Sequence, residues 1–416
     1  MISPGQLHPI HGRVIAVSER KGFQDIALLV KGETHTVQGL LGDPALAPGD
    51  LVVLDPTDSG APPRVLRVGG PTRGAWDPEG DALRWQRSTV SPNRMKLLWK
   101  RQTILRTVRE YFYDQGFLEA QTPLLARGAC PDVHLSPIQA ADGYLVTSTE
   151  YQIKRMIVGG FEKVFTLTQN FRGGDAGMHH NPEFTMLEWA RAFSPLEAIE
   201  NDAEALVKRA LEALDPGAEC IHYRGRTIRL SGVHWERLSV RGALSRYLRV
   251  DIDPEFSPTS IEKAASRDDL GIEVRFRNDP HAALTLLLDQ LTPHLGFEAP
   301  VFLTDWPAFM TTSASLTPGS PALAERSELF IAGIELSDGF PSLRDPAQQE
   351  DLFARELARR EEAGLPSVPL DTRYVQALHQ GLPPGAGMAL GFDRLAMLLT
   401  GQEHIRSILP FSWDEL

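Results

Sequence analysis

The chain has 416 residues, of which 42% are hydrophobic and 23% are charged, a composition typical of a soluble globular protein with more than one domain. It holds no run of about 18 apolar residues and no signal-peptide pattern, so no membrane span is expected and a cytoplasmic location is predicted. The net charge of −12 argues against a protein that mainly coats nucleic acid, and two isolated cysteines, Cys130 and Cys220, argue against a disulfide framework or a Cys/His zinc site.

The first 70 residues contain short β-rich runs separated by Gly, Pro and charged turns. These runs are HGRVIAVSE, FQDIALLVKG, THTVQGLL and GDLVVLD. Several short strands within so few residues predict a small closed β-barrel of the OB type over residues 1–70. Residues 71–92 are rich in Pro, Gly and Asp and predict a linker, and residues 93–416 form the remaining, larger domain.

Helical periodicity begins near Met95 and returns several times in the larger domain. In the run SPLEAIENDAEALVKRALEAL, Ser194 is the expected N-cap, Pro195 fits the first turn, and Glu197 completes a capping box. A further helix is predicted from Ser239. The run AQQEDLFARELARREEAG predicts a charged, amphipathic helix that faces solvent.

Strand-like runs lie between these helices. They are GFLEAQTPLL, KVFTLTQNF, EFTMLEWARAF, ELFIAGIELSDGF and GAGMALGFDR. Strands dominate the middle of the domain without a regular βαβ alternation. This order predicts an α+β fold with a mostly antiparallel sheet.

Arg172 ends one of these strands and is followed by a glycine-rich loop, and Phe184 lies in the next strand. An arginine beside such a turn can hold a phosphate oxygen, and Phe184 could offer a stacking surface to adenine. The alternative is that Phe184 belongs to the core and that Arg172 forms a surface ion pair. The spacing leaves both interpretations open.

Two other segments could contribute to the same chemistry. Glu328 and Glu335 lie in two short strands joined by an Ala-Gly turn, where they could face one pocket and hold Mg²⁺, or could lie on a solvated face. Arg394 lies where a glycine-rich strand enters a helix, and it could meet a purine or a phosphate or be solvated. Glu150 opens a predicted helix and could bind a substrate ammonium. The loop histidine His180 is a candidate ATP ligand, although a surface role fits it equally.

The order of these segments is more specific than any one of them. The runs GFLEAQTP, FRGGDAGMHHNPEFTMLEW and GAGMALGFDRLAML resemble motifs one, two and three of class II aminoacyl-tRNA synthetases. HNPEFTMLEW and ERSELFIAGIELSDGF are similar to the lysyl type. PDVHLSP, TSTEYQIKRMIVGG, WERLSVRGALSRYL and LGFEAPVFLTDWPA are similar to its paralogues, the elongation factor P lysine ligases. The resemblance covers roughly residues 80–416.

The resemblance implies an antiparallel sheet of six or seven strands flanked by helices, and a homodimer formed largely through motif one. It implies ATP and Mg²⁺, with Arg172 on the α-phosphate and substrate carboxylate and with Phe184 and Arg394 around adenine. Arg172 and Arg394 are therefore the expected catalytic residues. Glu328 and Glu335 would hold Mg²⁺. The remaining implied roles are Glu150 on the substrate α-ammonium, Glu188 near the substrate, and Asp175 and His180 on the ATP side.

Four substrate-pocket positions bear on specificity. Ala190 stands where the lysine enzymes have a Tyr, Ser342 where they have a Glu, and Asp338 where they have an Asn. By the resemblance, the missing Tyr and Glu hold the lysine side-chain ammonium, and an ammonium buried without a partner is costly. Ala389 matches the elongation factor P ligases rather than the tRNA-charging enzymes.

The leading hypothesis is an ATP-dependent ligase that moves lysine or a related amino acid onto a protein lysine, such as that of elongation factor P. The second is a lysyl-type tRNA-charging enzyme. The N-terminal barrel could bind an anticodon, although Phe23 is its single aromatic residue. An amino acid ligase or amide synthetase acting on a small molecule is the third hypothesis, and a non-catalytic regulator that binds amino acid or nucleotide is the fourth.

Overall fold

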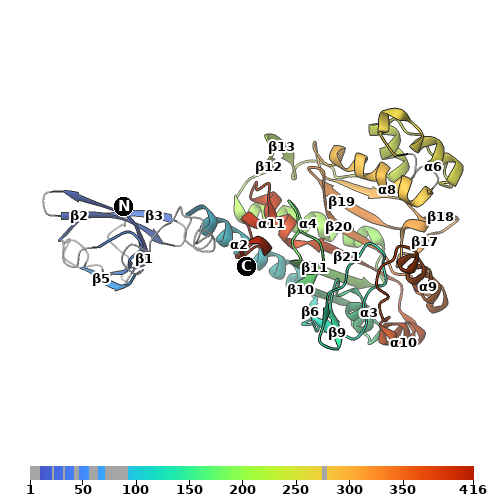
Figure 1. The fold of residues 1–416 in the computed structure, drawn as a ribbon, viewed down its shortest axis with the longest axis horizontal. Helices are drawn as coiled ribbons and strands as arrows, with labels where there is room; N and C mark the ends of the chain where they lie inside the picture. Colours follow the sequence, from blue (N-terminus) through green and yellow to red (C-terminus); the bar gives the residue numbers. More distant parts are fainter. Residues whose placement is uncertain are drawn as a thin grey trace. The chain divides into compact units, whose positions relative to one another are not determined.

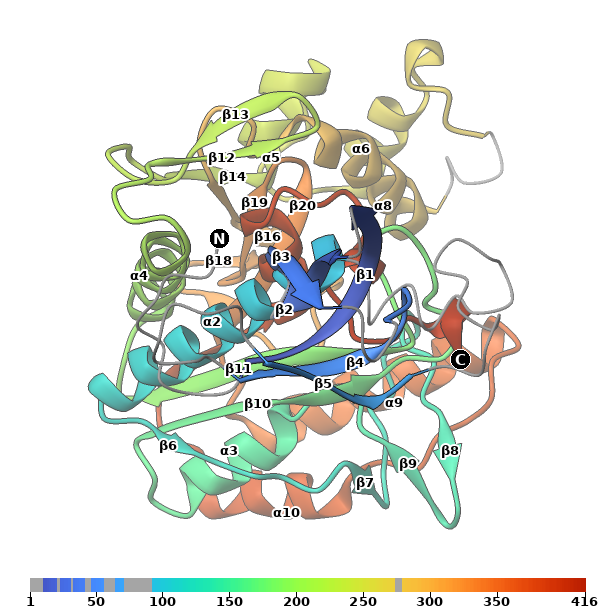
Figure 2. The ribbon, with the colours of Figure 1, turned by 90° about the vertical axis from the view of Figure 1, so that its left-hand side faces the viewer.

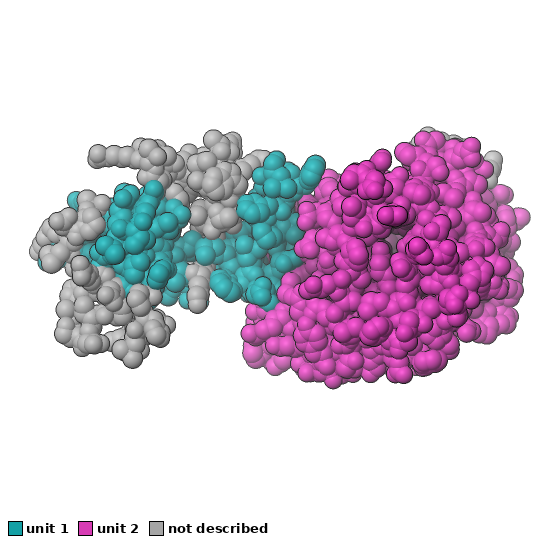
Figure 3. Space-filling model, turned by 90° about the horizontal axis from the view of Figure 1, so that it is seen from below, with its two compact units in different colours: residues 1–102, 406–416 teal, residues 103–405 magenta. Residues whose placement is uncertain are grey.

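A computed structural model describes residues 10–20, 23–30, 33–41, 46–55, 64–70, 92–273 and 279–416 (Figure 1). The chain divides into two compact units. One holds residues 1–102 and 406–416, and the other holds residues 103–405, as coloured in Figure 3. The predicted linker lies outside the described residues except for Pro92. None of the described helices combines the length and the apolar character needed to cross a membrane.

The first unit contains a five-stranded antiparallel sheet in the order β3-β2-β1-β4-β5. Its strands are β1 (Ile10–Arg20), β2 (Phe23–Val30), β3 (Glu33–Leu41), β4 (Leu51–Asp55) and β5 (Arg64–Gly69). Alternate side chains such as Val14, Leu28 and Val52 are buried together, so the β-rich prediction is confirmed. No pairing joins β3 to β5 among the described strands, and closure into an OB-type barrel stays a prediction.

The second unit is built on an eight-stranded sheet in the order β14-β15-β19-β20-β21-β11-β10-β6. Its strands are β6 (Leu118–Glu119), β10 (Lys163–Phe171), β11 (Glu183–Ala192), β14 (Glu236–Ser239), β15 (Val301–Thr304), β19 (Ser327–Ile331), β20 (Ile334–Pro341) and β21 (Gly385–Gly391). The α+β prediction is confirmed. The expected six or seven antiparallel strands need correction, because β6 and β14 add a parallel pair at each edge. Helices separate β6 from β10 and β14 from β15, and such crossovers produce parallel pairing.

Helices cover both faces of this sheet. They are α2 (Pro92–Asp114), α3 (Glu150–Val158), α4 (Leu196–Leu214), α5 (Val240–Ala243), α6 (Pro258–Ala265), α8 (Pro280–Leu291), α9 (Pro346–Glu362), α10 (Thr372–Gly381) and α11 (Phe392–Leu399). In Figure 2, α3 and α10 lie together beneath β10, and they pack against Val164, which is buried, and Ala190, which is partly buried. On the opposite face, the Phe112 ring of α2 stacks on Phe165 at 4.8 Å and lies 5.4 Å from Trp189.

Three small sheets complete the unit. They are β12 (Cys220–Tyr223) with β13 (Arg226–Arg229), β16 (Trp306–Pro307) with β17 (Leu316–Thr317) and β18 (Ser320–Ala324), and β7 (Leu125–Ala126) with β8 (Gln139–Ala140) and β9 (Gly143–Leu145). Both cysteines are free, as predicted.

Of the helix starts predicted at Ser239 and Ser194, the first is confirmed and the second is wrong. Ser239 caps α5 by accepting a hydrogen bond from the Gly242 backbone N–H at 3.1 Å, which confirms that start. The capping box predicted at Ser194 is wrong. Pro195 is the N-cap of α4, and the Ser194 hydroxyl donates instead to the Ala192 carbonyl at 3.2 Å. The left-handed backbone of Phe193, with φ of 56°, makes the turn between strand and helix and separates Ser194 from the first turn.

Helix α9 also departs from expectation. It was predicted as a charged, solvent-facing helix, and most of its charges are exposed. However, it buries Phe353 together with the ionisable side chains of Glu356 and Arg360. Buried charges are costly without partners, so this face of α9 must serve a specific contact.

Candidate active site

All thirteen residues singled out in the sequence line one pocket of about 770 Å³ in the second unit. They are Glu150, Arg172, Asp175, His180, Phe184, Glu188, Ala190, Glu328, Glu335, Asp338, Ser342, Ala389 and Arg394. The structure therefore brings the three motif-like segments and the Glu-rich hairpin to one place. The functional role of each residue remains a prediction.

Strand register explains how distant segments meet. Glu328 of β19 lies opposite Asp338 of β20, Asp338 lies opposite Ala389 of β21, and Ala389 lies opposite Glu188 of β11. Residues directly opposite one another share a face of a sheet. Four candidates from four strands thus form one row across the pocket floor.

Arg172 leaves the end of β10 with its guanidinium over the Phe184 ring, 5.2 Å from the ring centre. Its backbone N–H donates to the Pro182 carbonyl at 2.9 Å, which closes the glycine-rich loop. Its Nε is buried without a hydrogen-bond partner in the part of the chain that the structure describes. The surface ion pair considered for Arg172 does not form among those residues. The guanidinium is thus available to an anion, while Phe184 is only half-buried and presents its ring to the pocket.

Arg394 lies at the edge of the pocket, where Glu335 and His180 hold its guanidinium in place. Its Nη1 donates to the Glu335 carbonyl at 2.7 Å and lies 3.7 Å from the Glu335 carboxylate. Its Nη2 lies 2.6 Å from Nε2 of His180. Burial and the Arg394 charge lower the pKa of His180, which favours the neutral ring that can accept this hydrogen bond. The solvated position considered for Arg394 is not observed, because its side chain is largely buried.

The neighbouring His179 ties the loop to the β12–β13 hairpin. Its ring lies 3.2 Å from the Tyr223 hydroxyl, and its carbonyl accepts from Arg394 Nε at 3.4 Å. Burial, together with the charges of Arg224 and Arg394, lowers its pKa to about 4. His179 is therefore neutral near pH 7 and acts here as a packing and hydrogen-bonding residue.

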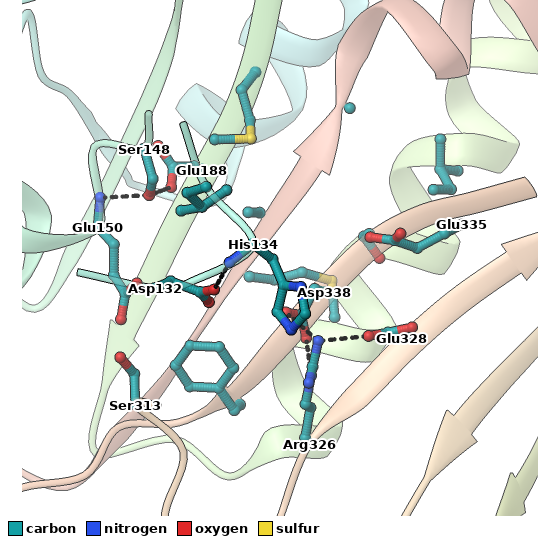
Figure 4. A pocket seen from close by; sticks show the side chains of 18 of the residues that line it. Asp132, His134, Ser148, Glu150, Glu188, Ser313, Arg326, Glu328, Glu335 and Asp338 are labelled. Carbon is teal, nitrogen blue, oxygen red and sulfur yellow. Dashed lines mark hydrogen bonds and ion pairs between the residues drawn. The ribbon is translucent and has the colours of Figure 1, made fainter. Parts of the chain in front are cut away.

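Arg326 lies between the carboxylates of Glu328 and Asp338, which form an acidic wall of the pocket. It is not among the site residues predicted from the sequence. It bonds Glu328 at 2.6 Å and Asp338 through two hydrogen bonds of 3.0 and 3.1 Å (Figure 4). Its guanidinium also lies 4.5 Å from the centre of the Trp306 ring. Burial raises the pKa values of Glu328 and Asp338, and the Arg326 charge opposes that rise. Its position two residues before Glu328 in ERSELF was the available signal.

Glu328 and Glu335 are the candidate metal ligands. They come from the hairpin β19–β20 and lie on the same side of the pocket in Figure 4. No group of three or more His, Cys, Asp or Glu side chains forms a metal site in the described ranges. Mg²⁺ does not need such a cage, because it commonly takes one or two carboxylates together with substrate phosphates and water. The donor set therefore fits Mg²⁺ beside a triphosphate.

The other end of the pocket is formed by α3 and the ends of the central strands. Glu150 binds Lys154 at 2.5 Å, and Lys154 lies 5.4 Å from the Phe340 ring centre and 5.8 Å from that of Tyr374. Burial alone would lower the pKa of Lys154, but the adjacent Glu150 charge outweighs it and the pKa is raised. The i,i+4 spacing on α3 was the signal for this missed pair.

Glu188 is satisfied by its surroundings. It accepts hydrogen bonds from the Ser148 hydroxyl and from the backbone N–H and the hydroxyl of Thr149. Burial raises its pKa in spite of those hydrogen bonds. Glu188 therefore fixes the start of α3, and with it the position of Glu150.

Small residues leave space beside these groups. Ala190 lies opposite Gly387, and Gly387 lies opposite Phe340. Ser342 follows the end of β20, with its backbone N–H donating to the Gly385 carbonyl at 3.1 Å. This end of the pocket therefore offers room but no carboxylate at positions 190 and 342.

A large sheet flanked by helices, with one pocket holding paired arginines and glutamates, is the arrangement expected of a class II synthetase. The family described as tRNA synthetases class II (D, K and N) matches residues 82–415. The chain belongs to this family and is an enzyme of the ligase type.

Relatives within the family are more specific. A protein of Edwardsiella ictaluri (strain 93-146), named elongation factor P–(R)-β-lysine ligase, is 34% identical over 346 residues, covering 80% of this chain and 99% of the relative. Proteins of the same name from Salmonella dublin and Enterobacter sp. (strain 638) are 34% identical over 342 residues, covering 79% of this chain and 98% of each relative. The part of this chain outside the match has no counterpart in these relatives.

Proposed function

We propose that this protein is an ATP-dependent ligase that forms an aminoacyl-adenylate and transfers the aminoacyl group to a lysine side chain of a protein. The amino acid is lysine or a related amino acid, and elongation factor P is the acceptor, as in the names of the relatives. The observation that carries the proposal is that Arg172, Arg394, Glu328 and Glu335 line one pocket.

The reaction has two steps. A carboxylate oxygen of the amino acid attacks the α-phosphorus of ATP, the bond to the β-phosphate breaks, and pyrophosphate leaves. The neutral amine of the acceptor lysine then attacks the acyl carbon, and AMP leaves with the bonding electrons. The acceptor nitrogen loses its proton as the amide forms.

The pocket supports this chemistry through position and charge. The Arg172 guanidinium, whose buried Nε has no hydrogen-bond partner among the described residues, would hold the α-phosphate and the substrate carboxylate together. Phe184 and Arg394 would hold adenine between them, with Asp175 and His180 on the same side. Glu328 and Glu335 would hold Mg²⁺, which when bound neutralises charge on the phosphates.

The substrate end would hold the amino acid. Glu150 would bind the α-ammonium while Glu188 fixes Glu150 through the start of α3. Asp338, Ser342, Ala190 and Ala389 would surround the rest of the substrate.

Three further features belong to the proposal. We propose a homodimer formed through α2 and β6, supported by two exposed large apolar side chains, Tyr113 near the end of α2 and Leu118 at the start of β6. The domain boundaries of 1–70, 71–92 and 93–416 and the cytoplasmic location likewise remain predictions.

The test is ATP–pyrophosphate exchange across all amino acids and common diamino acids, followed by acceptor assays with elongation factor P and with tRNA. We expect exchange with the wild-type protein and transfer to elongation factor P. Arg172→Ala should lower the exchange rate by about 100-fold or more, because it removes a group aimed at the reacting charge. Arg355→Ala, on the exposed face of α9, is the control. Full exchange in Arg172→Ala would contradict the assigned role.

A second candidate function is tRNA charging, and the extra N-terminal sheet is the observation that favours it. Phe23, the single aromatic residue of that segment, is exposed on β2 and could stack on a base. Charging of tRNA without transfer to elongation factor P would promote this candidate. Product formation from a small-molecule amine alone would favour an amide synthetase instead.

A further inference from the structure

We propose that Asp132 determines specificity for an amino acid with a second ammonium group, by receiving that ammonium at the amino-acid end of the pocket. The inference rests on the proposed amino-acid-activating function and names a residue that neither the motif comparison nor the family match assigns. Asp132 would be a partner for the side-chain ammonium of the substrate, for which Ala190 and Ser342 provide no carboxylate.

The carboxylates that line the pocket differ in whether they have a cationic partner. Most of them already have a cationic partner. These pairs are Glu150 with Lys154, Glu328 and Asp338 with Arg326, Glu335 with Arg394, and Glu356 with Arg359. Glu188 has no cationic partner in the part of the chain that the structure describes, but it accepts three hydrogen bonds, and Asp393 is buried against the Thr185 N–H.

Three pocket carboxylates have no ion-pair partner among the described residues. Unlike Glu188 and Asp393, they are not buried. They are Asp132, Asp175 and Asp289. Asp175 belongs to the loop after Arg172, on the ATP side, and Asp289 lies on α8. Only Asp132 belongs to the amino-acid end. A substrate cation entering that end would find its uncompensated charge there.

Several oxygen acceptors lie close to Asp132 at the amino-acid end of the pocket. Asp132, Glu150 and Ser313 all line the pocket, and Figure 4 shows Asp132 beside Glu150, with the Glu150 carboxylate facing the Ser313 hydroxyl and the Asp132 carboxylate turned toward the His134 backbone N–H. An ammonium carries three N–H donors, and oxygen acceptors on several sides suit it. Glu150 bonds Lys154 through Oε1, and in the proposed function its other oxygen, Oε2, takes the α-ammonium, so Asp132 and Ser313 remain for a second ammonium.

Helix α9 holds the loop that carries Asp132 in place. The buried Arg360 of α9 donates to the carbonyls of Asp132 and Leu135, both at 2.9 Å. Glu356, also buried, accepts from the Val133 N–H at 3.0 Å. The Asp132 carboxylate itself accepts from the His134 N–H at 2.8 Å. These contacts explain why α9 buries two ionisable side chains, because they clamp the loop that presents Asp132.

The clamp restricts the carboxylate to one region of the pocket before substrate binds. A preorganised partner loses less entropy when a ligand ammonium arrives, so discrimination against an uncharged side chain is greater. The expected substrate class is therefore a diamino acid such as lysine or (R)-β-lysine.

The test is the selectivity between lysine or (R)-β-lysine and norleucine, which is lysine without its terminal ammonium, in ATP–pyrophosphate exchange. The wild-type protein should prefer a diamino acid. Asp132→Asn keeps an oxygen that can accept from the His134 N–H but removes the charge. We expect kcat/KM for the diamino acid to fall by about 100-fold, mostly through KM, while norleucine is unaffected.

Asp142→Asn, at an exposed site in the following turn, is the matched control and should leave the selectivity unchanged. A loss of activity in Asp132→Asn that is equal for both kinds of substrate would overturn the inference, because that is the pattern of a structural role. Wild-type preference for norleucine or another uncharged amino acid would also overturn it. The adenylate-forming part of the proposed function would then stand, but its assignment of lysine or a related amino acid would not. Absence of exchange with every amino acid would overturn the proposed function and this inference together.

Discussion

At the residue scale, Arg326 shows how one cation holds an acidic wall together. It neutralises Glu328 and Asp338, which are both largely removed from water. Without it, two carboxylates would face each other across adjacent strands of the sheet. When one partner of a buried ion pair is removed, the loss of stability is larger than the net stabilisation that the intact pair provides.

We therefore expect Arg326→Met to lower the free energy of unfolding by about 3 kcal/mol. Urea unfolding followed by circular dichroism measures it. The exposed Arg344→Met is the control and should change stability by less than about 0.5 kcal/mol. Equal stability of the two variants would show that Arg326 does not carry this charge balance.

His179 makes stability depend on pH. Its pKa is about 4 in the folded protein, against an ordinary value of 6.5. Between these values the unfolded chain binds a proton that the folded chain refuses, so the free energy of unfolding falls as pH is lowered through this window. His179→Gln should lose less stability than the wild type between pH 7 and pH 5.

Thermal unfolding at the two pH values measures this difference, with the exposed His222→Gln as the control. The raised pKa values of Glu328 and Asp338 act in the opposite sense, because folding then favours their protonated forms. Both carboxyl groups are present in the wild type and in each variant, so their contributions to the pH dependence of stability cancel when the proteins are compared. An identical pH response of His179→Gln and the wild type would refute the prediction.

At the element scale, the N-terminal cap of α9 supports a loop of the pocket. Asp345 caps it by accepting from the backbone N–H groups of Ala347 and Gln348 at 2.9 and 3.2 Å. Pro346 then occupies the first turn, where it needs no donor. The cap holds the helix that carries Glu356 and Arg360, and so supports the clamped loop.

Asp345→Ala should cost about 1 kcal/mol of stability, the usual effect of losing a capping carboxylate. Urea unfolding of the full chain measures it. Asp351→Ala on the same helix is the comparison, because its exposed pair with Arg355 contributes little. A larger effect at Asp351 than at Asp345 would contradict the assigned cap.

At the scale of the whole molecule, the proposed dimer is the feature that a single chain leaves open. Tyr113 and Leu118 expose 51% and 43% of their surfaces at the end of α2 and in β6. Leu118→Arg should shift the protein from dimer to monomer in sedimentation velocity. Leu316→Arg, at an exposed site on β17, should remain dimeric. A monomeric wild type at micromolar concentration would refute the dimer.

The sequence by itself determined the central strands β10, β11, β19, β20 and β21, the hairpin at Ala332 and Gly333, and the identity of the residues that would share a pocket. The strands and the hairpin could be predicted because period-two patterns and turn residues are local properties of the chain. The order of motifs added long-range information that no single motif carries.

Only the tertiary structure decided the rest. The partners of Arg326, the pairing of β6 and β14 at the sheet edges, and the clamp of Arg360 on the Asp132 loop join residues far apart in sequence. Their identity follows from which side chains are buried together, and the energy of a buried charge depends on its neighbours in space. The same reason explains Ser194, which satisfies a local capping rule yet bonds elsewhere because the turn at Phe193 points it back to the strand.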